Sequence, residues 1–238
     1  MFAQERALVA ARSSMGHLRI IKTPGISTSN LPARKSTTPN TMPVYQNRHG
    51  FPGPLDCGDE DMFDGKVASW IVSELEKSQS KPFFLAYGLT KPHLTWEVPQ
   101  KYFDLHPIDG IELPPITEGD LDDVPGFGKK LAREVYDPSG ERNFAVKPAG
   151  DHANVIANRQ WSKAVQAYLA TISFADAQIG RVLDALDRSR HADNTIIVLW
   201  GDHGWHLGEK EHWRKHALWD VSTRTPLCLL YTSDAADE

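Results

Sequence analysis

The sequence predicts an α/β fold in which strands and helices alternate, forming a mostly parallel sheet with helices on both faces. Two short apolar runs, residues 82–88 and 195–200, are typical of buried parallel strands. Apolar residues at helical spacing precede each run. Each run is followed by a loop that carries histidine and charged residues. In such sheets, ligands bind beyond the carboxyl ends of the strands.

Composition narrows the class of protein. The chain has 238 residues, of which 40% are hydrophobic and 24% charged, enough to bury a real core. Its net charge of −5 argues against nucleic acid as a main partner, because phosphate binding needs a basic surface. No apolar stretch approaches the length of a membrane span. We therefore expect neither a nucleic-acid partner nor a membrane span.

The pattern divides the chain into three segments. Residues 1–50 are rich in Ser, Thr, Pro and Arg and show no sustained period, so we expect a disordered segment or a doubtful start. No signal peptide is recognisable there. Residues 51–227 are patterned and are expected to form the folded domain. Residues 228–238 resemble the translation of a sequencing adapter, and we exclude them from fold reasoning.

Within the patterned segment, acidic residues 59–61 precede a predicted helix that spans Val67 to Leu75. Residues 105–158 are rich in Pro, Gly, Asp and Asn, which predicts a long irregular insertion that faces the substrate. A long amphipathic helix follows, from Trp161 to Leu186. Asp176 lies on its apolar stripe and is expected to be buried and hydrogen-bonded.

The residues that could carry chemistry follow the two strands. His93 follows the first strand, and Asp202 and His203 follow the second, so parallel strands would bring them to one edge of the sheet. Asp202 suits Ca²⁺ or Mg²⁺, whereas His203 favours a metal such as zinc, so the pair leaves the metal open. His93 and Lys215 could bind a tetrahedral oxyanion from two sides. Taken singly, each is more typical of a structural histidine or a solvated lysine.

Other candidates are weaker. His206, His212 and His216 have the pattern of an exposed polar loop face. Cys57 lies among acidic residues, which raise a thiol pKa, so a catalytic thiol is not expected there. Cys228 belongs to the excluded segment. The two cysteines also lack the spacing of metal ligands.

Several motifs together carry a family resemblance, and they lie in order along residues 51–227. They are residues 81–88, 91–93 (Lys-Pro-His), 98–103, 168–176, 180–183, 202–209 (beginning Asp-His-Gly), 213–215 (Trp-Arg-Lys) and 224–227. Together they resemble the type I sulfatases of the iduronate-2-sulfatase type. The resemblance implies an alkaline-phosphatase-like α/β sandwich, represented here by a partial catalytic domain that is incomplete at both ends.

The resemblance also implies roles for individual residues. Asp202 and His203 match the metal-binding pair of the family, usually around Ca²⁺, with Mg²⁺ as a further possibility. His93 and Lys215 match residues that hold the sulfate group of a sulfated carbohydrate or another small sulfate ester. Thr90 departs from the family pattern, which leaves the sugar preference open. The family implies a periplasmic, extracellular or lysosome-like location.

The family nucleophile lies in a Cys/Ser-x-Pro-x-Arg motif and is oxidised to formylglycine. Neither cysteine of this chain lies in such a motif, so we expect formylglycine only in the full-length protein and no hydrolysis by this fragment. Two alternatives stay open. One is a metal-dependent phosphodiesterase or phosphatase of the same superfamily, with zinc and an attacking Thr or Ser. The other is a non-catalytic remnant.

Overall fold

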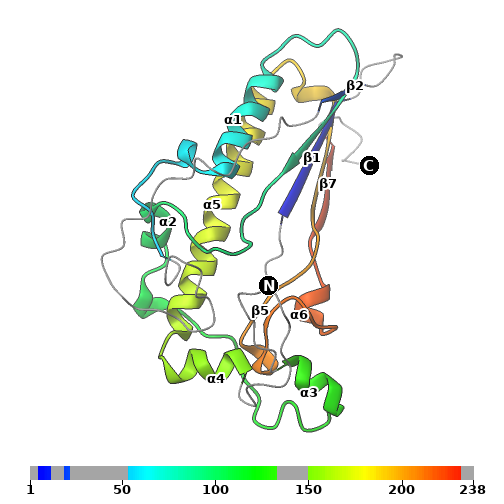
Figure 1. Cartoon of the computed structure of the whole chain (residues 1–238). Coiled ribbons are helices and arrows are strands. Elements are labelled where there is room, and N and C mark those ends of the chain that lie inside the picture. Colours follow the sequence, from blue (N-terminus) through cyan, green and yellow to red (C-terminus); the bar gives the residue numbers. More distant parts are fainter. Residues whose placement is uncertain (1–4, 12–18, 22–52, 133–149, 232–238) are drawn as a thin grey trace.

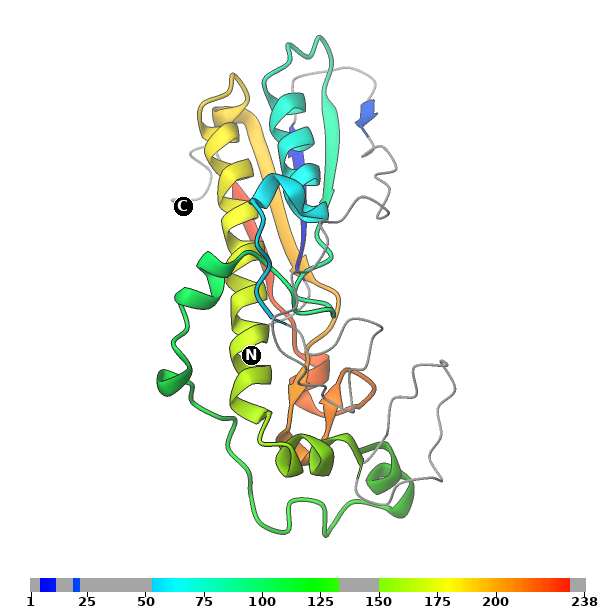
Figure 2. The same ribbon diagram turned by 60° about the vertical axis from the view of Figure 1, so that its left-hand side comes forward.

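The computed structural model describes residues 5–11, 19–21, 53–132 and 150–231. A five-stranded sheet with the strand order β2-β3-β1-β4-β7 lies beside two long helices, α1 and α5 (Figure 1). The strands are β1 (Glu5–Ala11), β2 (Arg19–Ile21), β3 (Phe83–Gly88), β4 (Thr195–Gly201) and β7 (Leu227–Tyr231). Figure 2 shows α1 and α5 side by side along the sheet, where they make many contacts with each other.

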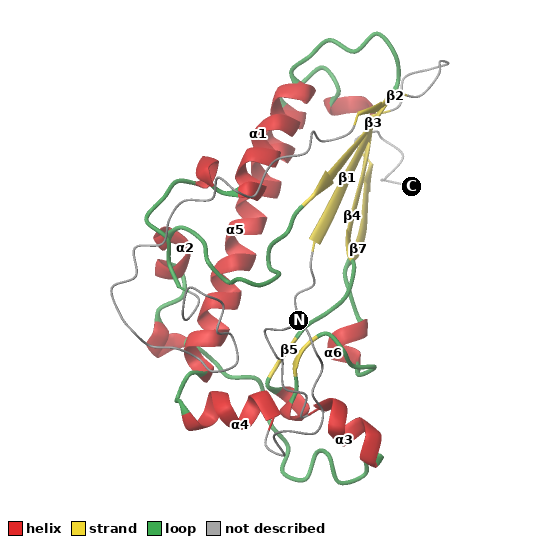
Figure 3. Cartoon of the chain, viewed as in Figure 1, coloured by secondary structure: helices red, strands yellow, loops and turns green. Residues whose placement is uncertain are grey.

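The predicted helices and strands are present. The helix expected from Val67 to Leu75 is α1 (Phe63–Leu75), and the long amphipathic helix is α5 (Trp161–Asp187). The smaller elements are η2 (Asp59–Asp61), α2 (Gln100–Asp104), η3 (Ile108–Gly110), α3 (Gly126–Ala132), α4 (Gly150–Ala157), η4 (Ala192–Asn194), β5 (His206–Leu207), η5 (Glu209–Glu211), β6 (Trp213–Arg214) and α6 (Asp220–Thr223). Of these, α3, α4, β5 and α6 lie below the sheet in Figure 3, and α2 lies to the left, beside α5.

The strand directions bring the two predicted loops to one edge. β3 and β4 both pair antiparallel with β1, so they run parallel to each other. Gly88, the last residue of β3, pairs with Arg6, and Gly201, the last residue of β4, pairs with Glu5. The carboxyl ends of β3 and β4 therefore lie at the same edge of the sheet, on either side of β1, as the sequence predicted.

The sheet as a whole corrects the prediction. The α/β class is confirmed, but among the described pairings only β2–β3 is parallel, so the sheet is mixed rather than mostly parallel. Three of the strands come from segments for which we expected no regular structure. β1 and β2 lie within residues 1–50, and most of β7 lies beyond Leu227. The apolar runs in β1 and β7 pair antiparallel with β4, on either side of it.

Helices cover one face of the sheet rather than two in the part of the chain that the structure describes (Figures 1 and 2). α5 joins two buried clusters. One is formed with α1, β3 and β4 around Ile71 and Leu85, and the other surrounds Trp96 and Phe174 near the loops. Asp176 is exposed, contrary to expectation, and the buried polar side chains of α5 are Thr171 and Gln178. None of the described helices is both long and apolar enough to cross a membrane.

The start of α1 depends on a close backbone contact. The acidic turn η2 precedes the helix, and the Asp61 carboxylate accepts a hydrogen bond from the Gly58 amide at 2.9 Å. A β-carbon on Gly65 would lie 1.7 Å from the carbonyl oxygen of Asp59, so only glycine fits there. This contact fixes the first turn of α1, which carries the buried Asp64.

Candidate anion and metal site

The loop after β3 carries the first candidate. His93 is half-buried, and its Nδ1–H donates to the carbonyl oxygen of Leu94 at 2.9 Å. That bond leaves the opposite nitrogen, Nε2, available to a ligand. The loop is tied at its base, because the His93 amide donates to the Thr90 carbonyl at 2.9 Å.

The pKa of His93 is lowered below its ordinary value. Burial is the main cause that lowers its pKa below the ordinary value. The hydrogen bond to the Leu94 carbonyl opposes this lowering, and the positive charges of Lys215 and Lys91 add to it. The rings of His93 and His203 both lie against Trp205, with centroid distances of 5.8 and 6.4 Å, so the loops after β3 and β4 approach each other. That all four candidate side chains meet in one site stays a prediction.

Asp202 and His203 form a pair after β4. The distance between His203 Nε2 and Asp202 Oδ2 is 3.7 Å. His203 Nδ1–H donates to the Gly204 carbonyl at 2.8 Å, so Nε2 carries the lone pair. This nitrogen is buried and has no hydrogen-bond partner among the described residues. A carboxylate oxygen and a bare imidazole nitrogen at this separation suit two positions around one divalent cation.

A metal site needs more than this pair. In the described part of the chain, no group of three or more His, Cys, Asp or Glu side chains is arranged to hold a metal ion. Calcium usually takes six or more oxygen ligands. Asp202 and His203 therefore fit part of a metal site, and the rest of the ligands would have to come from other residues.

An aromatic residue that the sequence analysis missed supports both imidazoles. Trp205 is buried, and its ring lies 5.8 Å from that of His93 and 6.4 Å from that of His203. Trp96 and Tyr168 pack on Trp205 with centroid distances of 6.0 and 6.3 Å. The Asp-His-Gly-Trp order, which sets Trp205 two residues after His203, is the signal of this role in the sequence, because His93, Trp96 and Tyr168 lie far away along the chain.

The β5–β6 hairpin corrects a further prediction. The sequence predicted that His206, His212 and His216 are exposed. His206 and His212 are buried, with 0% and 1% exposure, and of the three only His216 is exposed. The rings of His206 and His212 contact each other and Trp219. Aromatic packing thus buries imidazoles that looked like an exposed polar face.

The predicted insertion packs against this hairpin. Asp120 pairs with Lys210 at 2.5 Å between Oδ1 and Nζ, and the Ala132 carbonyl accepts from His212 Nδ1 at 3.2 Å. His152, on α4, accepts from the Trp213 indole at 3.3 Å. The insertion therefore braces the hairpin that leads to Lys215; whether it faces a substrate stays a prediction. Residues 133–149 of the insertion lie outside the described residues.

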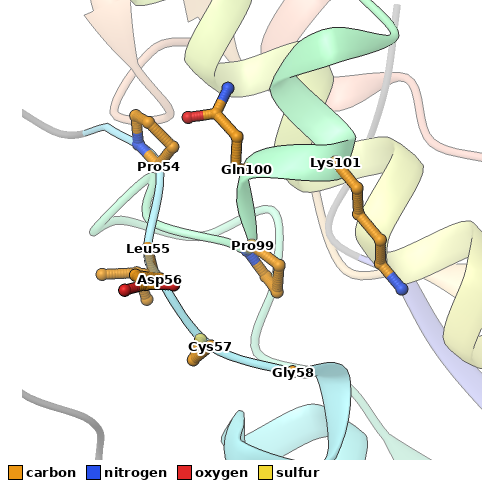
Figure 4. Close-up of a pocket in the computed structure, with 8 residues that line it drawn as sticks. All are labelled: Pro54, Leu55, Asp56, Cys57, Gly58, Pro99, Gln100 and Lys101. Carbon is orange, nitrogen blue, oxygen red and sulfur yellow. The ribbon is translucent and has the colours of Figure 1, made fainter.

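A separate pocket of about 500 Å³ lies between residues 54–58 and 99–101 (Figure 4). The two segments are joined by the Leu55 amide, which donates to the Val98 carbonyl at 2.9 Å. Cys57 lines the pocket, and burial together with nearby carboxylates, Asp61 first, raises the pKa of its thiol. The direction of this shift is the one expected from the acidic neighbours, and none of the four candidate site residues lines this pocket.

Chemically, the residues at the carboxyl ends of β3 and β4 can hold an anion beside a cation. Lys215 supplies a fixed positive charge, and His93 supplies a nitrogen that can donate once protonated. Asp202 and His203 supply two metal ligands.

Comparison with known proteins agrees with this arrangement. Residues 22–237 match the family model described as Sulfatase. A protein named Sulfatase from Formosa agariphila is 44% identical over 175 residues, which are 74% of this chain and 32% of that protein. Iduronate 2-sulfatase of Mus musculus is 37% identical over 158 residues, which are 66% of this chain and 28% of that enzyme. The chain thus spans about a third of the length of these curated relatives.

Among solved structures, the phosphonate monoester hydrolase of Agrobacterium radiobacter has a similar fold, with a TM-score of 0.63. The match covers 86% of this chain and 38% of that one, at 18% sequence identity. At this identity the likeness shows the fold alone.

Proposed function

Because the chain belongs to the sulfatase family, we propose that the whole protein is a sulfuric ester hydrolase that acts on sulfated sugars. The observation that supports the proposal is the approach of His93 and the Asp202–His203 pair, whose imidazole rings both lie against Trp205 after two parallel strands. With Lys215, which we propose to join them, a cation and a donor beside a partial metal site would suit a sulfate ester, an anion whose oxygens gain charge during cleavage.

We assign the sulfate to His93 and Lys215. The Lys215 ammonium acts as a point charge, and His93 presents its Nε2 side because Nδ1 is engaged with Leu94. A bound anion would favour protonation of His93, which then donates to a sulfate oxygen. Burial first, and then the neighbouring positive charges, hold the pKa of free His93 down, so we propose that this proton is taken up when the anion binds.

Asp202 and His203 would hold a divalent cation, which we propose to be Ca²⁺, with Mg²⁺ as the second possibility. When bound, such a cation would supply charge that stabilises the sulfuryl oxygens. Neither Cys57 nor Cys228 lies in a Cys-x-Pro-x-Arg motif, so neither is proposed as the precursor of the formylglycine nucleophile. For the full-length protein we propose a periplasmic, extracellular or lysosome-like location, in line with the family.

The competing function is a phosphodiesterase or phosphatase that uses zinc. One observation favours it: the bare Nε2 of His203 beside Asp202 is also a suitable zinc ligand. Metal identity and substrate choice together separate the two functions.

The test uses the full-length protein that carries this sequence. We expect stoichiometric calcium in the purified protein and hydrolysis of 4-nitrocatechol sulfate, which Lys215→Ala lowers at least about 100-fold. Lys210→Ala is the matched control, since Lys210 lies on the same hairpin but pairs with Asp120. Stoichiometric zinc with turnover of a phosphate diester would establish the competing function instead. Calcium without turnover of either ester would indicate a non-catalytic remnant.

A further inference from the structure

The loop that carries His93 is held from below by a carboxylate on another element. Asp64 lies in the first turn of α1 and is 2% exposed. Its Oδ1 accepts from the Thr90 amide at 2.9 Å, and its Oδ2 accepts from the Lys91 amide at 2.8 Å. Two successive peptide groups of the loop are thereby fixed by one side chain.

These bonds continue directly to His93. The peptide group that joins Thr90 to Lys91 donates its N–H to Asp64 and also supplies the carbonyl that accepts from the His93 amide. The side chain of Lys91 donates from Nζ to the Thr95 carbonyl on the far side of the loop. The position of the His93 ring therefore depends on a chain of hydrogen bonds that begins at Asp64.

Burying the charged side chain of Asp64 costs free energy, which argues that this residue does more than fill space in the core. Burial raises the pKa of this carboxyl, while the Lys91 and Thr90 amides oppose the rise. A buried carboxylate is costly unless its acceptors are satisfied. Among the described residues, the hydrogen bonds of Asp64 go to the loop, so its charge is maintained by the same contacts that shape the loop.

We propose that Asp64 is a positioning residue that sets the geometry of His93 for sulfate binding; this inference rests on the proposed function. The charge of Asp64 and its positioning role should change the affinity for sulfate in opposite directions. A negative charge near an anion site weakens anion binding. If only the charge of Asp64 mattered, a neutral residue in its place would therefore strengthen the binding of sulfate. Loss of positioning would weaken it.

The experiment measures the affinity of the 238-residue chain for inorganic sulfate by titration calorimetry at low ionic strength. Asp64→Asn keeps the shape but sets an NH₂ group against a backbone amide, and Asp64→Ala removes both acceptors. Glu74→Gln is the matched control. It removes one charge from the same helix at a residue that is 8% exposed and pairs with Lys77. At ten residues along the helix it lies about 15 Å from Asp64.

We expect sulfate to bind about tenfold more weakly to Asp64→Asn, and more weakly still to Asp64→Ala, with Glu74→Gln unchanged. Equal affinities in Asp64→Asn and Glu74→Gln, or tighter binding to Asp64→Asn, would overturn the inference. His93→Ala tests the proposed function separately. If sulfate binds that variant as it binds the unmodified chain, or does not bind the unmodified chain, the proposed anion site is wrong whatever Asp64 does.

A second measurement needs no variant and covers the case in which Asp64→Asn fails to fold. In the unmodified chain, the amides of Thr90 and Lys91 should exchange with solvent as slowly as those of β3, although they lie in a loop. Fast exchange of these two amides beside a protected β3 would show that Asp64 does not hold the loop, and would overturn the inference.

Discussion

The buried imidazole of His206 should make the folded chain sensitive to acid. The side chain is 0% exposed, and its Nδ1–H donates to the Glu209 carbonyl at 3.3 Å. Burial lowers the pKa of His206 to about 4, the charge of Lys210 adds to the lowering, and the Glu209 carbonyl opposes it. Its Nε2 is buried without a hydrogen-bond partner among the described residues, so a proton there would be poorly solvated.

The change in the free energy of unfolding with pH follows from the different pKa of His206 in the folded and unfolded chain. Below about pH 6.5 the imidazole in the unfolded chain takes up a proton, whereas the folded chain resists protonation until the pH approaches the lowered pKa of His206, about 4. Neutral His206 therefore contributes full stability above about pH 6.5, and this contribution is lost as the pH falls toward about 4. The difference corresponds to about 3 kcal/mol in the free energy of unfolding.

Urea unfolding of the chain, its His206→Gln variant and its His216→Gln variant between about pH 7.5 and about pH 4 measures this contribution. We expect the unmodified chain and His216→Gln to lose about 3 kcal/mol more than His206→Gln over that range. His216 is the matched control, since it is exposed on the segment after β6. Equal losses in all three proteins would refute the assignment of acid sensitivity to His206.

Two further outcomes are expected. Gly204→Ala should lower the free energy of unfolding by more than about 3 kcal/mol, because the new β-carbon would lie 1.8 Å from the Val221 carbonyl oxygen. Gly180→Ala, where no atom lies within 4 Å of the added carbon, is the control, and equal midpoints of urea unfolding in the two variants would contradict the packing argument. The 238-residue chain, incubated with calcium and 4-nitrocatechol sulfate, should show no turnover above a Lys215→Ala control. Turnover above that control would mean that a nucleophile has been overlooked.

The sequence predicted the parts of the fold that repeat a simple pattern. The apolar residues of α1 and α5 recur at helical spacing, and β3 and β4 are continuous apolar runs between turn residues. The placement of His93 and His203 followed from their position directly after parallel strands. These features depend on local pattern, so they can be read without the rest of the chain.

Other features depend on partners that the sequence does not mark. β1 has no alternation of its own and becomes a strand because β3 and β4 lie on either side of it. His206 and His212 lie on either side of the charged turn Glu209–Glu211, yet Trp219 packs over them. Asp64 reaches a loop 26 residues later, and nothing in its helical context indicates that contact.

The length of α5 has a mechanical consequence. Its 27 residues extend about 40 Å, from the end that packs near Trp205 and Trp213 to the end that packs on α1 and β3. Each half of this rod is buried by a different cluster, so neither cluster can loosen without exposing part of a helix that the other holds. A disturbance at the remote end of the sheet is thus transmitted as a tilt of one rigid body, and the anion site should melt together with the sheet rather than ahead of it.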